Sequence, residues 1–119
     1  MPDRKKRVSV QPRFRIYSRK EIALGPGKAD LLTAIAATGS IQKGAAKLHM
    51  SYMRAWNLVR IMNGCFRTPL VEALRGGKSK GGAQLTPLGK KILSLYQALE
   101  TKSLRATASI QKKITAQLK

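Results

Sequence analysis

Cysteine, histidine, acidic residues and aromatic residues are all scarce in this chain of 119 residues. Its one cysteine, Cys65, excludes an internal disulfide framework and is typical of a reducing compartment. Its one histidine, His49, and five scattered acids form no metal-ligand spacing. A His49–Cys65 nucleophile pair is the one catalytic alternative, and a thiol packed in the fold is favoured over it. We therefore expect no enzymatic activity, no metal and no cofactor.

Long hydrophobic runs are also missing. No apolar segment approaches the roughly 18 residues that span a bilayer. The basic start of the chain lacks the apolar core of a secretory signal. These absences predict a cytoplasmic protein that does not insert in a membrane.

Positive charge, in contrast, is abundant. The chain has 24 lysines and arginines against five acids, a net charge of +19. Eight of the basic residues lie in 1–20 and nine in 76–119. A compact domain with this charge repels itself, so the expected partner is a polyanion. We favour nucleic acid over the alternative of a merely basic protein without such a partner.

Residue patterns predict an arm, a strand and a first helix at the start of the chain. Residues 1–12 are polar and basic, which is typical of a flexible arm. Residues 13–19 alternate in hydrophobicity with the period of a half-buried strand. After a break at 24–27, apolar residues at helical spacing predict a helix over 28–38, which Gly39 ends.

Two further helices are predicted from their capping residues. Ser40 is a good N-cap for a short helix that ends near Leu48, and Ser51 can cap a longer helix to about Cys65. The tight link between them predicts a helix-turn-helix over 40–65. Such a unit holds its second helix rigidly enough to enter the major groove of DNA.

Residues 70–85 predict a β-hairpin in which two short strands flank a glycine-rich, basic tip. The tip resembles part of a phosphate-binding P-loop, but that motif requires a glycine where this chain has Glu72. A wing that approaches the DNA backbone or minor groove fits better. Its contacting side chains would be Lys78, Ser79 and Lys80.

The final segment begins with a strong helix signal, an N-cap threonine at Thr86 followed by Pro87. No proline, and no glycine after Gly89, interrupts the rest of the chain. An apolar stripe predicts one long helix over 87–119, about 32 residues and 48 Å in length. A domain of this size cannot cover such a stripe alone. We therefore expect a homodimer through this helix, with the 13–19 strand as a further candidate contact.

A helical wheel of 51–65 separates an inner from an outer face. The inner face contains Tyr52, Ala55, Trp56, Val59, Met62 and Asn63, and all of these except Asn63 are predicted to join the core. The outer face contains Met53, Arg54, Asn57, Arg60 and Ile61. Arg54 can pair with guanine and Asn57 with adenine; the alternative is that the arginines only solvate an exposed face. Tyr52 is ambiguous, because its ring can pack while its hydroxyl reaches a phosphate.

We therefore predict two groups of DNA contacts besides the wing. The recognition helix would contribute Ser51, Tyr52, Met53, Arg54, Asn57 and Arg60. The first helix of the helix-turn-helix would contribute Ser40, Gln42 and Lys43.

Within 31–99 the sequence resembles the N-terminal DNA-binding domain of the molybdate-responsive (ModE-type) transcriptional regulators, a domain similar to the winged helix of LysR-type regulators. The matching residues are Thr38–Ile41, Ala45-Ala46, Met50–Trp56, Met62-Asn63, Pro69–Glu72, Gly76-Gly77, Gly81–Ala83 and Leu85–Gly89. The resemblance implies a dimer that binds a palindrome-like operator. Full-length members carry oxyanion-binding domains that sense molybdate or tungstate. No strand-rich segment follows Thr86 here, so molybdate sensing is not carried over and any effector is unknown.

The expected fold is mainly α with a small β-hairpin: a winged helix-turn-helix over 13–86 and a dimerisation helix over 87–119. The expected function is sequence-specific binding of double-stranded DNA by a nucleoid-associated transcriptional regulator. Three alternatives stay open. They are an architectural protein with little sequence preference, an RNA-binding or ribosome-associated protein, and membrane-surface binding by 101–119.

Overall fold

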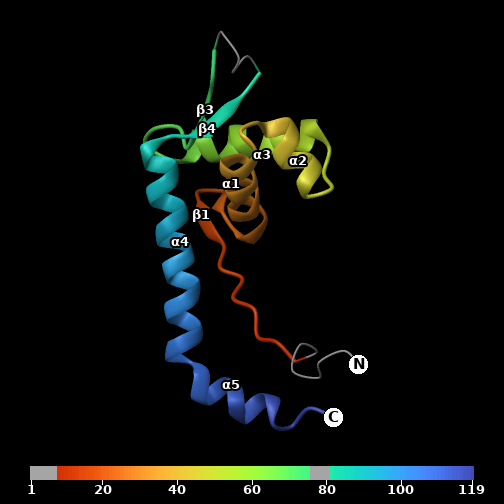
Figure 1. Ribbon diagram of the computed structural model, residues 1–119. Coiled ribbons are helices and arrows are strands. Elements are labelled where there is room, and N and C mark those ends of the chain that lie inside the picture. The colour runs from red at the N-terminus through yellow and green to blue at the C-terminus, as the bar shows by residue number, and fades with distance from the viewer. Residues whose placement is uncertain (1–7, 76–80) are drawn as a thin grey trace.

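The computed structural model describes residues 8–75 and 81–119 and is mostly helical (Figure 1). Within these residues the strands form two separate antiparallel sheets of two strands each. The predicted fold class, mainly α with a small hairpin, is therefore confirmed. Two details differ from the sequence prediction: a second hairpin lies near the N-terminus, and the C-terminal segment contains two helices.

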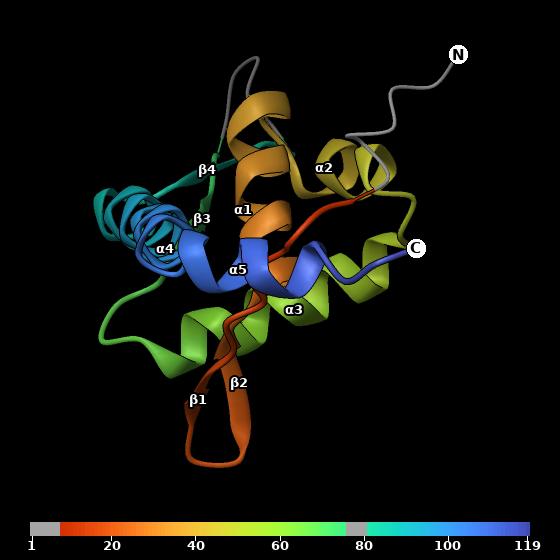
Figure 2. The ribbon, with the colours of Figure 1, turned by 90° about the horizontal axis from the view of Figure 1, so that it is seen from below.

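The additional hairpin consists of β1 (Ile16–Ser18) and β2 (Glu21–Leu24). The alternation in 13–19 predicted the first strand, although the strand is shorter, and the second strand was missed. The chain reverses at Arg19, whose φ of 57° is unusual for a residue other than glycine. No glycine or Asn-Gly pair marks this turn, so it had no signal in the sequence. Figure 2 shows the hairpin projecting from the helices.

The centre of the core is α1 (Pro26–Thr38), which packs against the next two helices, β4 and α4. Leu31, Leu32 and Ile35 are fully buried on this helix. Gly39 ends it with a φ of 84°, a conformation that favours glycine, and its N–H donates to the Ile35 carbonyl over 2.8 Å. The predicted start and end of the first helix are confirmed within two residues.

The helix-turn-helix also forms as predicted, from α2 (Ile41–Lys47) and α3 (Tyr52–Cys65). The Ser40 hydroxyl accepts a hydrogen bond from the Lys43 N–H at 2.9 Å, and the Ser51 hydroxyl accepts one from the Arg54 N–H at 3.1 Å. Both serines are therefore N-caps. Since a cap fixes the first turn of a helix, these two bonds define where each helix begins.

The second hairpin, predicted over 70–85, comprises β3 (Val71–Ala73) and β4 (Ala83–Leu85). Val71 pairs with Leu85, and both side chains are buried. The N–H of Ala83 donates to the carbonyl of Gly39 over 2.9 Å, so the base of the hairpin is attached to the link between α1 and α2. The predicted tip, 76–80, lies outside the described residues.

The C-terminal segment forms α4 (Pro87–Ala106) and α5 (Ala108–Thr115), and the prediction of one continuous helix was wrong. The chain bends at Thr107, whose side chain donates to the Ser103 carbonyl over 2.7 Å. Gln111 donates to the Leu104 carbonyl over 2.8 Å. In a continuous helix a backbone N–H would donate to this carbonyl instead. Figure 1 shows α5 turned away from the line of α4. The apolar stripe is therefore divided into two parts with different directions.

Two buried polar groups connect these elements. The Tyr96 hydroxyl of α4 donates to the carbonyl of Phe14 over 2.7 Å, and burial raises the pKa of this phenol. The Lys28 ammonium of α1 donates to the carbonyl of Ile22 over 2.6 Å. Burial lowers the pKa of Lys28, because the charged form loses hydration. Both bonds fasten the N-terminal segment to the helices.

The start of α4 is held against the connection between α3 and β3. Thr86 accepts a hydrogen bond from the Gly89 N–H at 2.9 Å, and its own hydroxyl donates to the Pro69 carbonyl over 2.7 Å. Gly89 is buried, and a Cβ atom at this position would overlap the carbonyl oxygen of Leu70. Only glycine allows this approach of α4 to the Leu70 backbone.

Gly89→Ala should therefore lower the free energy of unfolding by about 1–3 kcal/mol, in the range of overpacked sites. Gly64→Ala is the matched control, because its Cβ would meet nothing within 4 Å inside α3. That control should be neutral or stabilise by roughly 0.5–1 kcal/mol. Urea unfolding followed by circular dichroism measures both changes. Equal stabilities of the two variants would contradict the proposed close packing.

Candidate DNA-binding surface

One side chain joins the predicted recognition helix α3 to the predicted wing. The Asn63 Oδ1 atom accepts hydrogen bonds from the N–H groups of Leu70 at 2.8 Å and Val71 at 3.2 Å. The Asn63 Nδ2 atom donates to the Val71 carbonyl over 3.1 Å. The side-chain amide of Asn63 therefore forms hydrogen bonds with the backbone at the start of β3, and these bonds fix the angle between α3 and β3. Sequence analysis placed Asn63 on the inner face without a role, although a polar residue there is the signal of such a contact.

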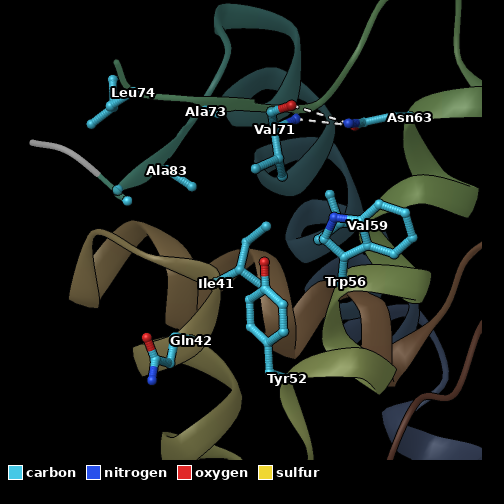
Figure 3. A pocket seen from close by; sticks show the side chains of 12 residues that line it. Ile41, Gln42, Tyr52, Trp56, Val59, Asn63, Val71, Ala73, Leu74 and Ala83 are labelled. Carbon is cyan, nitrogen blue, oxygen red and sulfur yellow. Dashed lines mark hydrogen bonds between the residues drawn. The ribbon is translucent and has the colours of Figure 1, made fainter. Parts of the chain in front are cut away.

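A cleft of about 780 Å³ separates α3 from the base of the wing. Tyr52, Trp56 and Asn63 line it from α3, Ile41 and Gln42 line it from the start of α2, and the two wing strands form the opposite wall (Figure 3). None of the described residues that line it is charged. The described lining of the cleft is therefore uncharged, although the chain has a net charge of +19.

Four of the five residues on the predicted outer face of α3 are exposed, and the fifth, Ile61, is half-buried. Met53, Arg54, Asn57 and Arg60 all reach solvent, and none of them lines the cleft. Arg54 lies near enough to Lys28 to lower the pKa of that residue, although burial is the larger cause. The helix thus presents a polar, basic outer surface and a separate uncharged flank toward the wing.

The other predicted DNA contacts belong to the starts of α2 and α3 and to the wing tip. Ser40 and Ser51 act as N-caps through their oxygen atoms and retain their hydroxyl protons for donation. Gln42 is exposed and lines the cleft, whereas Lys43 is exposed outside it. The predicted wing contacts Lys78, Ser79 and Lys80 lie outside the described residues.

The placement of Trp56 in the core was wrong. Its side chain is 42% exposed, and that of Tyr52 is 49% exposed. The core contacts of α3 are made by Ala55, Val59 and Met62, which form a narrower stripe than the wheel suggested. Both rings lie at the edge of this stripe, where the wing leaves a cleft instead of covering them.

The described residues give no indication of a metal site. They contain no cluster of three or more His, Cys, Asp or Glu side chains arranged to hold a metal ion.

None of the helices in the described ranges has the length and apolar character needed to cross a membrane.

No protein-family model matches the chain. The molybdenum-pterin-binding protein MopB of Rhodobacter capsulatus is 37% identical over 99 residues, which is 83% of this chain and 37% of MopB. The DNA-binding transcriptional dual regulator ModE of Escherichia coli K12 is 38% identical over 81 residues, 68% of this chain and 31% of that protein. The chain is a homologue of the ModE-type regulators.

The ModE-type relationship agrees with the family resemblance found in the sequence. A further relative, the molybdenum transport protein ModE of Azotobacter vinelandii, is 41% identical over 66% of this chain and 29% of its own length. The chain therefore spans about a third of the length of these ModE-type relatives, between 29% and 37%.

A solved structure supports the fold independently. The crystal structure of the CbnR_DBD–DNA complex superposes with a TM-score of 0.56 at 19% identity, over 76% of this chain and 97% of that chain. At this identity the likeness concerns the fold alone. The ModE-type homologue has a winged-helix fold, as predicted.

Asn63→Ala should lower the free energy of unfolding by about 2–3 kcal/mol, because two N–H groups lose their acceptor at a partly buried site. Asn57→Ala, an exposed change on the same helix, should alter it by less than about 0.5 kcal/mol. Urea unfolding compares the two, and hydrogen exchange at Val71 tests the wing directly. Unchanged exchange at Val71 in Asn63→Ala would argue against this link.

Proposed function

We propose that this chain is a DNA-binding transcriptional regulator that recognises a specific double-stranded sequence. The observation that supports it is the rigid joint between α3 and the wing. Asn63 holds the two elements at a fixed angle, and α3 exposes Arg54, Asn57 and Arg60 on its outer surface. In this proposal α3 enters the major groove and the wing approaches the neighbouring backbone or minor groove.

The comparisons support the same class of activity. The relatives include proteins named as transcriptional regulators, and the structural neighbour was solved with DNA. The names of several relatives also refer to molybdenum. We limit the proposal to DNA binding, since the chain spans about a third of those proteins.

Selection of bound duplexes from a random pool tests specificity, symmetry and half-site spacing together. We expect a preferred sequence with two-fold symmetry and an affinity above that for random DNA at physiological salt. A steep dependence of affinity on salt without any preferred sequence would instead identify an architectural protein. Stronger binding to RNA than to duplex DNA would overturn the proposal.

Single changes should separate base recognition from backbone binding. Arg54→Ala should reduce the preference for the selected duplex over random DNA by roughly tenfold. The double variant Lys78→Ala, Lys80→Ala should weaken binding to both duplexes about equally and reduce the slope of log affinity against log salt by about two. Fluorescence anisotropy of labelled duplexes measures both effects. If the two variants lose preference to the same degree, α3 is not the recognition helix.

We further propose a homodimer formed through α4. Leu95 and Leu99 of this helix are 55% and 37% exposed, and Ile16 of β1 is 43% exposed beside them. All three line an apolar groove of 220 Å³ in which the Tyr96 ring also takes part. Apolar side chains one turn apart on an exposed helix are typical of a helix–helix interface. A second copy packed along α4 would place two recognition helices on one palindromic site.

The double variant Leu95→Asp, Leu99→Asp should be a monomer because its charges would be buried in this interface. Gln97→Asp introduces one such charge at an exposed position of α4 and should remain a dimer. Sedimentation at micromolar concentration distinguishes the two states, and circular dichroism checks the helix content. A monomeric wild-type chain under these conditions would rule out the proposed dimer.

A further inference from the structure

Three large apolar side chains are exposed at the first turns of α3. Tyr52 is 49% exposed, Met53 is 61% exposed and Trp56 is 42% exposed. Residues three and four apart are neighbours on a helix, so Trp56 adjoins both of the others. Together they form a continuous patch, which we call the aromatic patch. Ala55, Val59 and Met62 of the same helix are buried in the core, whereas these three side chains stay partly exposed at its edge.

Two residues of the patch, Tyr52 and Trp56, line the cleft, and Met53 lies outside it. Figure 3 draws Tyr52 and Trp56 on the flank of α3 that faces the wing, with Ile41 beside them. Val59, Val71 and Ala83 line the same cleft and are buried. Lysine and arginine supply the charge that attracts phosphate groups, and none of the described lining residues is charged; the polar side chains among them are Gln42, Tyr52 and Asn63. The cleft is therefore suited to an apolar group next to a polyanion.

Duplex DNA presents one such group in its major groove. Each thymine carries a C5-methyl there, and apolar side chains distinguish thymine by contact with it. The aromatic patch lies on the same helix turns as Arg54 and Asn57, so it would enter the groove together with these polar residues. Burial of an aromatic ring against a methyl group gives discrimination without a hydrogen bond.

We propose that the aromatic patch recognises thymine methyl groups in the major groove, with Trp56 as the main contact. This rests on the proposed function and deepens it, since it names a base feature that the helix selects. The polar outer face of α3 supplies hydrogen bonds to base edges, and the aromatic patch supplies apolar contact at separate positions. The bound sequence then contains thymine at a fixed place in each half-site.

Replacement of thymine by deoxyuridine, which lacks only the methyl group, tests the proposal. In a duplex selected by the wild-type chain, each thymine is replaced singly and affinity is measured by anisotropy. We expect about a fourfold loss at one or two positions of each half-site, the effect of one buried methyl-sized group. Trp56→Ala should bind thymine and deoxyuridine duplexes equally well at the position that Trp56 contacts. Trp56→Phe should retain part of the difference.

The control variant is Tyr17→Ser, which removes an aromatic ring that is 63% exposed on β1, outside the cleft. It should keep the full deoxyuridine penalty. An independent readout uses the wild-type chain, because Trp56 is its only tryptophan. Quenching of its fluorescence by acrylamide, a neutral molecule, should fall when the selected duplex saturates the protein.

Each result has one interpretation. A preferred sequence with no deoxyuridine penalty at any thymine overturns the inference but leaves the proposed function intact. The same conclusion follows if Trp56→Ala keeps every penalty, or if acrylamide quenching is unchanged in the complex. Selection that returns no preferred sequence overturns the proposed function, and this inference with it.

Discussion

The position of the wing depends on a junction around Leu70, where α3, β3 and α4 meet. Asn63 holds the Leu70 and Val71 amides from one side, and Thr86 holds the Pro69 and Leu70 carbonyls from the other. Gly89 allows α4 to approach until its backbone touches the Leu70 carbonyl. These contacts involve backbone groups, so they fix the direction of β3 as well as its distance. A recognition helix and a wing can bind one duplex together only if their relative angle is fixed.

Local signals in the sequence predicted most of the helix ends. Ser40, Ser51 and Thr86 each accept the expected hydrogen bond from the third residue of their helix, and Gly39 has the expected left-handed conformation. Such caps depend on residues within one turn of the chain, which is why the sequence reveals them. The same holds for the apolar spacing of α1 and for the alternation that indicated β1.

Features that depend on distant residues were not predictable in this way. Trp56 has an apolar side chain on the apolar side of its wheel, and only the position of the wing leaves it uncovered. Strand β2 exists because the chain reverses at Arg19 without a typical turn residue. The hydrogen bonds of Asn63 can form only because β3 lies beside α3 in the folded chain. Each of these outcomes was decided by packing between segments, and periodicity within one segment carries no information about it.

The bend at Thr107 limits how far two copies could run together. In a dimer packed along α4, the exposed Leu95 and Leu99 would face the partner, whereas Ile110 and Ile114 of α5 follow a different axis. One straight partner helix cannot cover both pairs, since the bend separates them. The contact between the two copies would therefore end at Thr107, after α4. Each α5 would point away from the two-fold axis with an apolar surface of its own.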